Sequence, residues 1–145
     1  GPVTVKSVSP QETQALLEAG AVYVDVRSEP EFEAGHAPGS FNVPLLHAGG
    51  AGMVPNPEFL EVMQRCFGKN EQLVMGCRSG QRSLRAAEML IQVGYTDVSN
   101  LFTGWEGTRD AFGRMTPGWR AEGLPVELGK PDGLRYEDAK TREAR

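Results

Sequence analysis

The chain has 145 residues, a length typical of one compact domain. Its composition, 39% hydrophobic and 23% charged, excludes a disordered or fibrous protein, and its net charge of −4 argues against binding to nucleic acid. No apolar run approaches the about 18 residues of a membrane-spanning helix, which argues against a membrane partner.

The first 20 residues lack a basic start followed by an apolar block, so they do not form a signal peptide. We therefore expect a cytoplasmic protein. Gly1-Pro2 is interpreted as the remnant of a purification tag, which leaves open that a targeting segment was removed with the natural N-terminus.

The two cysteines, Cys66 and Cys77, are too few for a disulfide framework, so a reducing compartment is the simpler interpretation. There is no C-x-x-C motif, and His36 and His47 lack ligand spacing with either cysteine. No metal site is predicted. In the absence of any pattern for assembly, we take the monomer as the default.

Strand and helix patterns alternate as far as Phe102. A capping box of Ser9 and Glu12 predicts the start of the first helix. This alternation predicts an α/β fold with a central, mainly parallel five-stranded sheet and helices on both faces. Strands are expected over 3–8, 21–26, 40–44, 72–76 and 98–102, and helices over 9–20, 28–35, 57–67 (capped by Asn56, after a glycine-rich loop over 47–56) and 82–94.

The pattern weakens after Phe102. Residues 103–115 are rich in turn formers, with at most one short helix, and 116–126 resemble a last capped helix and a closing segment. Residues 129–145 are highly charged and have few apolar anchors, so we expect a mobile or loosely docked tail. The predicted domain spans residues 3–128.

Cys77 ends an apolar strand, and Arg78, Arg82 and Arg85 follow it closely in an otherwise acidic chain. A loop that leads from a strand into a helix directs unpaired amides and the positive end of the helix dipole toward such a thiol. Gly80 lets the backbone curl so that successive amides point inward. We expect this loop to favour the thiolate and to attract an anion, so that no histidine base is needed.

A structural role for Cys77, with solvated arginines around it, is the alternative. Basic residues are disfavoured at a helix N-terminus, however, and a bound anion would offset that cost. The functional interpretation is therefore preferred for Cys77. Cys66 has no basic surroundings and is interpreted as structural.

Two segments resemble the rhodanese family of sulfurtransferases. "CRSGQR" (77–82) is similar to the family's active-site loop, and "YVDVRSEPEFEAGHAPGSFNVP" (23–44) is similar to its second signature, D-V-R followed by G-H-x-P-G-x-x-N-x-P. The resemblance covers roughly residues 4–126 and implies a single rhodanese-like domain. It departs from the family at Thr103, where a glycine is usual, and in the inserted segment "WEGTRDAFGRMTP" (105–117), which leaves the donor preference open.

The resemblance implies that Cys77 takes sulfane sulfur from a small anionic donor, with thiosulfate favoured, and forms a persulfide without any other cofactor. The acceptor would be cyanide in vitro or a thiol in the cell. Asp25 and Arg27 are expected to brace the loop, and Trp105 either lines the pocket mouth or covers the core. The residues expected to surround the substrate are Arg78, Ser79, Gly80, Gln81, Arg82 and Ser83.

Three alternatives stay open. A phosphatase or arsenate reductase uses the same logic of cysteine and arginine, but its loop resembles C-x5-R, and only four residues separate Cys77 from Arg82. A non-catalytic regulatory module often lacks the cysteine or the basic loop. A sulfur carrier would keep the persulfide chemistry and pass the sulfur to a partner protein.

Overall fold

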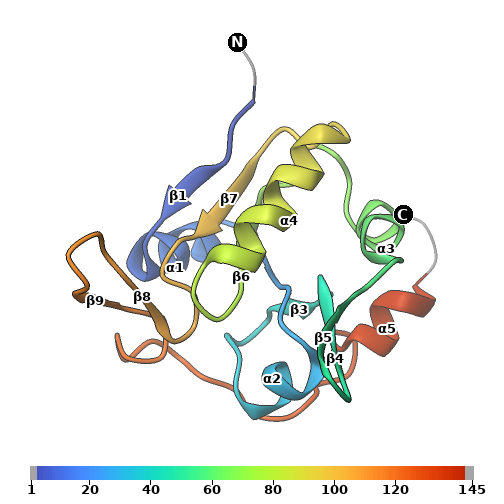
Figure 1. Ribbon diagram of the computed structural model, residues 1–145. Helices are drawn as coiled ribbons and strands as arrows, with labels where there is room; N and C mark the ends of the chain where they lie inside the picture. Colours follow the sequence, from blue (N-terminus) through green and yellow to red (C-terminus); the bar gives the residue numbers. More distant parts are fainter. Residues whose placement is uncertain (1–2, 143–145) are drawn as a thin grey trace.

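A computed structural model describes residues 3–142 as an α/β fold around one parallel sheet (Figure 1). Five strands lie in the order β1-β7-β6-β2-β3, and each is parallel to its neighbours, which confirms the predicted sheet. The strands are β1 (Lys6–Val8), β2 (Val22–Asp25), β3 (Phe41–Asn42), β6 (Leu73–Gly76) and β7 (Val98–Leu101).

Helices cover both faces of this sheet, also as predicted. Alternate side chains of a strand point to opposite faces, so Val24 and Met75 pack in one cluster while Tyr23 and Val74 pack in another. The first cluster also holds α3, α4 and α5, and the second is covered by α1. The helices are α1 (Pro10–Glu18), α2 (Glu29–Ala34), α3 (Phe59–Cys66), α4 (Gln81–Gln92) and α5 (Tyr136–Thr141).

Two hairpins lie where the sequence predicted other structure. The glycine-rich segment forms β4 (Leu46–Gly49) and β5 (Gly52–Pro55), an antiparallel pair. The inserted segment forms β8 (Gly107–Arg109) and β9 (Met115–Pro117), a hairpin that projects away from the sheet (Figure 1). The helices suggested within 103–126 were wrong, since the structure has none in that segment.

The expectation of a loosely docked tail was wrong for its described part, residues 129–142. Tyr136 and Ala139 of α5 are each 3% exposed and belong to the main core. The Nδ2 of Asn56 donates to the Tyr136 hydroxyl at 2.9 Å, and the amide of Asn42 donates to the Leu134 carbonyl at 2.9 Å. Residues 1–2, interpreted above as a tag remnant, and the rest of the predicted tail, 143–145, lie outside the described residues.

In the part of the chain that the structure describes, no helix combines the length and the apolar character needed to cross a membrane.

Candidate active site

Cys77 follows β6 directly and lies at the carboxyl edge of the sheet, where ligands bind in open parallel sheets. Its side chain is 1% exposed and is surrounded by the first turn of α4. The Sγ accepts hydrogen bonds from the amides of Gly80, at 3.1 Å, and Ser83, at 3.3 Å. The predicted arrangement of amides around the thiol is therefore present in this loop.

Gly80 makes that arrangement possible. Its φ of 94° lies in the left-handed region, and a Cβ there would be 2.1 Å from the Phe102 carbonyl oxygen. Only glycine fits both constraints. Among the described residues, the amides of Gln81 and Arg82 have no hydrogen-bond acceptor, so the loop keeps donors available for an anion.

Asn100 of β7 organises the loop from beneath and was missed by the sequence reasoning. Its Nδ2 donates to the Gly80 carbonyl at 3.1 Å, and its Oδ1 accepts from the Ser83 hydroxyl at 2.6 Å. The Ser83 Oγ lies 3.3 Å from the Cys77 Sγ. This pair holds the serine beside the sulfur, and only the pairing of β6 with β7 brings the three residues together.

The segment after β7 clamps the start of the loop. The Trp105 amide donates to the Cys77 carbonyl at 2.8 Å, and the Glu106 amide donates to the Arg78 carbonyl at 2.9 Å. Gly104 permits this approach, because a Cβ there would lie 2.5 Å from the Arg78 backbone. The family's usual glycine is replaced by Thr103, but the glycine that the close contact needs is present at the next position.

Arg82 is paired with Glu31 of α2, although the two are far apart in sequence. Its Nη1 and Nη2 donate to the two carboxylate oxygens at 2.9 and 3.0 Å. Burial by itself would raise the pKa of Glu31, but hydrogen bonds from Arg82 and from the Ser28 amide lower it to about 2. The hydrogen bond with Glu31 also raises the pKa of Arg82. This bidentate pair joins the loop to α2.

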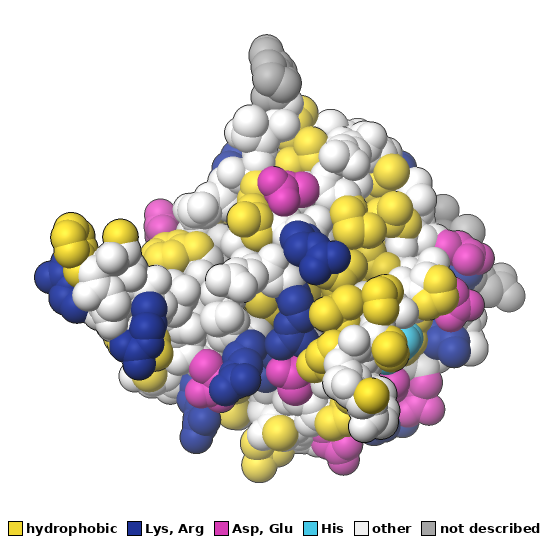
Figure 2. Space-filling model, in the orientation of Figure 1, with side chains coloured by type: hydrophobic (Ala, Val, Ile, Leu, Met, Phe, Trp, Pro, Cys, Tyr) yellow, Lys and Arg dark blue, Asp and Glu magenta, His cyan; other side chains and the backbone are white. Residues whose placement is uncertain are grey.

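Arg78 differs from Arg82. It is exposed, and no acidic partner lies beside its side chain within the described residues. Figure 2 shows Lys and Arg side chains gathered between the N-terminal end of α4 and the β8–β9 hairpin, on a chain that is acidic overall. Arg78 is thus the loop cation that is free to meet an incoming anion.

Asp25 and Arg27 form the buried pair that the sequence suggested. The Arg27 Nη2 lies 2.7 Å from the Asp25 Oδ2 and donates to the Gly35 carbonyl at 2.6 Å. Burial alone would lower the pKa of Arg27, but the adjacent carboxylate raises it. The guanidinium also lies over the Trp105 ring, 4.9 Å from its centroid, and so supports one wall of the site.

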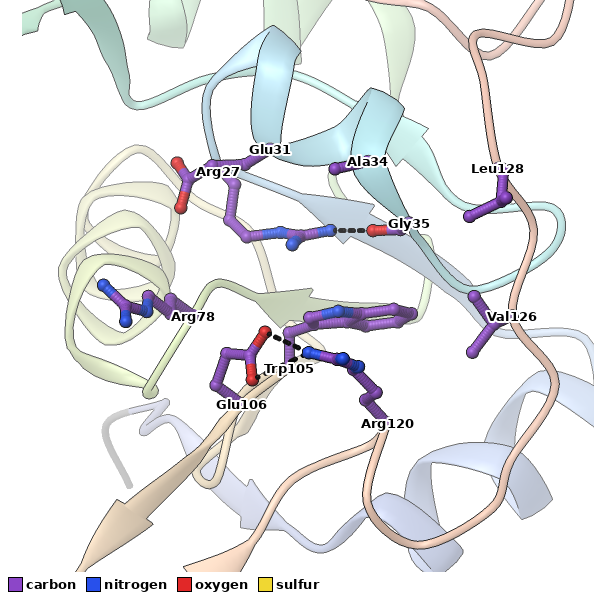
Figure 3. Close-up of a pocket in the computed structure, with 10 residues that line it drawn as sticks. All are labelled: Arg27, Glu31, Ala34, Gly35, Arg78, Trp105, Glu106, Arg120, Val126 and Leu128. Atoms are coloured by element: carbon purple, nitrogen blue, oxygen red, sulfur yellow. Dashed lines mark hydrogen bonds and ion pairs between the residues drawn. The ribbon is translucent and has the colours of Figure 1, made fainter.

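A cavity of about 590 Å³ lies beside the loop (Figure 3). Arg78 and Glu106 line one end, and the indole of Trp105 lies between the side chains of Arg27 and Arg120 in this view. Cys77 is not among the lining residues, so the cavity adjoins the cysteine loop through its neighbours. The remaining lining residues are Glu31, Ala34, Gly35, Val126 and Leu128.

This geometry agrees with the comparisons to known proteins. A profile of the Rhodanese-like domain family matches residues 9–111. The chain belongs to the rhodanese family. It is 38% identical to "Thiosulfate sulfurtransferase 16, chloroplastic" of Arabidopsis thaliana over 83% of this chain and 92% of that protein. The predicted cytoplasmic location stays a prediction beside this chloroplastic relative.

This rhodanese domain is also similar to a longer protein and to a solved structure. "Senescence-associated protein DIN1" of Raphanus sativus is 36% identical over 83% of this chain, which spans only 60% of that protein. The crystal structure of Rv0390 from M. tuberculosis has a TM-score of 0.72 and 31% identity, and the match covers 87% of this chain and 99% of that one.

Two more of the residues predicted for the site, Ser79 and Gln81, also lie on the loop. Ser79 is half-buried and Gln81 is exposed, and within the described chain neither side chain has a hydrogen bond to the sulfur of Cys77. Cys66 is 0% exposed in the core, and its thiol donates to the Ala139 carbonyl at 3.4 Å, which agrees with a structural role. Within residues 3–142, no group of three or more His, Cys, Asp or Glu side chains is placed to hold a metal ion.

Proposed function

We propose that this rhodanese domain is a sulfurtransferase that moves sulfane sulfur through a persulfide on Cys77. The observation that carries the proposal is the loop itself. Two amides already donate to the Cys77 sulfur, and those of Gln81 and Arg82 are free of other acceptors in the described chain. Such a ring of donors stabilises a thiolate and then a persulfide anion.

With thiosulfate as donor, the Cys77 thiolate attacks the outer sulfur. A sulfur–sulfur bond forms at Cys77, the bond within thiosulfate breaks, and its electron pair leaves with sulfite. The product on the enzyme is the persulfide anion. Cyanide or a thiolate then attacks the terminal sulfur and releases thiocyanate or a new persulfide, which restores the Cys77 thiolate. Neither step needs an added oxidant or reductant.

The positive charge for a small anionic donor comes chiefly from Arg78 in this proposal. Arg82 was also expected to bind the donor, but its bidentate pairing with Glu31 favours a role in holding the loop. The same pairing disfavours phosphate-ester chemistry, which would need that arginine free above the thiolate. Transfer to a partner protein remains the alternative fate of the persulfide.

The test is thiocyanate formation from thiosulfate and cyanide. Cys77→Ser is expected to abolish turnover, because a serine hydroxyl at this position neither ionises readily nor forms a persulfide. Cys66→Ser is the matched control and should retain most of the activity, since Cys66 is buried away from the loop and serine keeps its hydrogen-bond donor. Undiminished turnover in Cys77→Ser would refute the mechanism.

A further inference from the structure

The β8–β9 hairpin, residues 107–117, projects from the domain (Figure 1), and none of these described residues belongs to either core cluster. Every residue from 109 to 115 is exposed, including Phe112, at 83%, and Met115, at 54%. Burial in the domain therefore does not account for these side chains. Exposed aromatic side chains beside arginines are the composition that protein interfaces favour at their energetic centres.

Hydrogen bonds within the turn fix the end of the hairpin. The Asp110 carboxylate accepts from the amides of Phe112 and Arg114, both at 2.9 Å. Arg109 Nη1 donates to the Gly113 carbonyl at 2.8 Å, and the Arg114 guanidinium lies over the Phe112 ring, 5.3 Å from its centroid. The aromatic ring and the arginines are thus held together before any partner binds, which lowers the entropy cost of binding.

The hairpin is basic on a chain that is acidic overall. It carries two arginines and one aspartate, a net charge of +1, whereas the whole chain has a net charge of −4. The Asp110 carboxylate is already used by the turn and by Arg114, at 3.1 Å, and Arg109 has no acidic partner among residues 3–142. Hydrophobic and basic side chains lie side by side on this hairpin in Figure 2. Such a surface complements an acidic protein, while nucleic acid would favour a broader basic face.

The base of the hairpin lies beside the cysteine loop. The Glu106 amide donates to the Arg78 carbonyl at 2.9 Å, and the Arg120 amide donates to the Trp105 carbonyl at 3.2 Å. Glu106 and Arg120 flank the hairpin in sequence, pair with each other at 3.2 Å and line the cavity next to the loop. A protein bound to the hairpin would therefore lie next to the loop that holds Cys77.

We propose that the β8–β9 hairpin docks an acidic protein, with Phe112 as the apolar anchor and Arg109 and Arg114 facing carboxylates of the partner. This inference rests on the proposed function, because the docked protein supplies the acceptor thiol. Its thiolate attacks the terminal sulfur of the Cys77 persulfide and forms a sulfur–sulfur bond. The bond between the two sulfurs at Cys77 breaks, and its electron pair stays on Cys77 as the thiolate. Cyanide reaches the same terminal sulfur without the hairpin.

The test measures kcat/KM for sulfur transfer to two synthetic peptides, with thiosulfate as the saturating donor at low salt. Each peptide has an N-terminal cysteine and a glycine-rich spacer. One then carries Asp and Glu around a leucine, and the other carries Lys in place of the acids. Phe112→Ala and Arg109→Glu should each lower the value for the acidic peptide by about fivefold or more. Arg109→Glu should raise the value for the basic peptide, which structural damage would not do. Turnover with cyanide should be unchanged in both variants.

Two variants away from the hairpin are the matched controls. Met53→Ala removes an apolar side chain that is 44% exposed on β5, and Lys6→Glu reverses a charge at the amino end of β1, where the side chain is 63% exposed. Neither should change transfer to the acidic peptide. If Lys6→Glu lowers it as much as Arg109→Glu does, only the net charge of the protein matters and the inference is overturned. A wild type without preference for the acidic peptide, or hairpin variants that match the wild type, would overturn it too.

Binding of the acidic peptide with serine in place of its cysteine is followed in parallel by fluorescence anisotropy. The affinity should fall in Phe112→Ala and Arg109→Glu and stay at the wild-type level in the two controls. If the wild type forms no thiocyanate from thiosulfate and cyanide, the proposed function fails, and this binding measurement alone decides whether the hairpin docks an acidic chain. Tighter binding of a single-stranded DNA of equal charge than of the peptide would assign the surface to nucleic acid and overturn the inference.

Discussion

Arg78 and Arg82 carry the same charge on the same loop, but their partners give them different roles. Arg82 is held by two hydrogen bonds to Glu31, whereas Arg78 is exposed at the cavity without an acidic partner in the described chain. A paired guanidinium has little capacity left for a second anion, while a free one attracts substrate directly. The distinction depends on a contact between α2 and α4 that no local pattern in the sequence specifies.

Arg78→Ala should raise the KM for thiosulfate by about five- to tenfold at low salt, because one charge-assisted contact to the donor is lost. The effect should shrink as ionic strength rises. Arg85→Ala removes the same charge from an exposed position of α4 that does not line the cavity, and it should change the KM little. Equal effects from the two variants would mean that only the net charge of the surface matters.

The Glu31–Arg82 pair should also make stability depend on pH. The pKa of Glu31 is lowered to about 2 in the folded state, below the about 4.3 of an unfolded chain. The contribution of this ion pair to the stability of the folded state is therefore fully present above about pH 5 and is lost as pH falls toward 2. Glu31→Gln should cost about 1–2 kcal/mol in the free energy of unfolding at pH 7, and less at pH 3.

Urea unfolding of the wild type and Glu31→Gln at the two pH values measures this difference. Glu33→Gln is the control, since Glu33 is an exposed acid on the same helix with no ion pair recorded in residues 3–142. A gap between wild type and Glu31→Gln that stays constant from pH 7 to pH 3 would contradict the assigned role of the ion pair.

At the scale of secondary-structure elements, short sequence motifs predicted those features that depend only on neighbouring residues. The capping box of Ser9 and Glu12 is present, with hydrogen bonds of 3.1 and 2.8 Å, and α1 begins where it predicts. Asn56 shows the limit of this reasoning. It was expected to cap a helix over 57–67, and its Oδ1 does accept from the Glu58 amide at 3.0 Å. Residues 57–58 form only a turn, however, so the helix begins at Phe59, and the Asn56 Nδ2 donates to the Pro44 carbonyl and the Tyr136 hydroxyl. The local contact is present, and the hydrogen bonds of the Nδ2 to distant residues add a role that the local pattern did not specify.

The site shows the same division between local and distant determinants. Cys77 and Gly80 could be predicted because the strand end, the glycine and the helix start are adjacent in sequence. Asn100 and Glu31 could not, since they reach the loop only through the pairing of β6 with β7 and the packing of α2. The β8–β9 hairpin was missed because each of its strands has only three residues, too few for an alternating pattern, and one contains a glycine and the other a proline.

At the scale of the whole molecule, the C-terminal segment joins parts that the domain prediction had separated. Leu124 packs against the second core cluster, Val126 and Leu128 line the cavity, and α5 then packs against the main core. The helix was missed because only two of its side chains, Tyr136 and Ala139, face inward, too few for a recognisable apolar pattern. The burial of Tyr136 and Ala139 in the main core, rather than local composition, makes this segment part of the domain.

Truncation after Leu128 should therefore destabilise the protein, by about 3–5 kcal/mol, because it uncovers the core beneath Tyr136 and Ala139 and leaves the Asn56 amide without its hydroxyl partner. Thermal unfolding followed by circular dichroism measures the loss. Tyr136→Ala in the full chain should reproduce much of it, while Tyr136→Phe, which removes only the hydroxyl, should cost about 1 kcal/mol. A truncated chain that unfolds at the wild-type temperature would show that α5 contributes nothing to the fold.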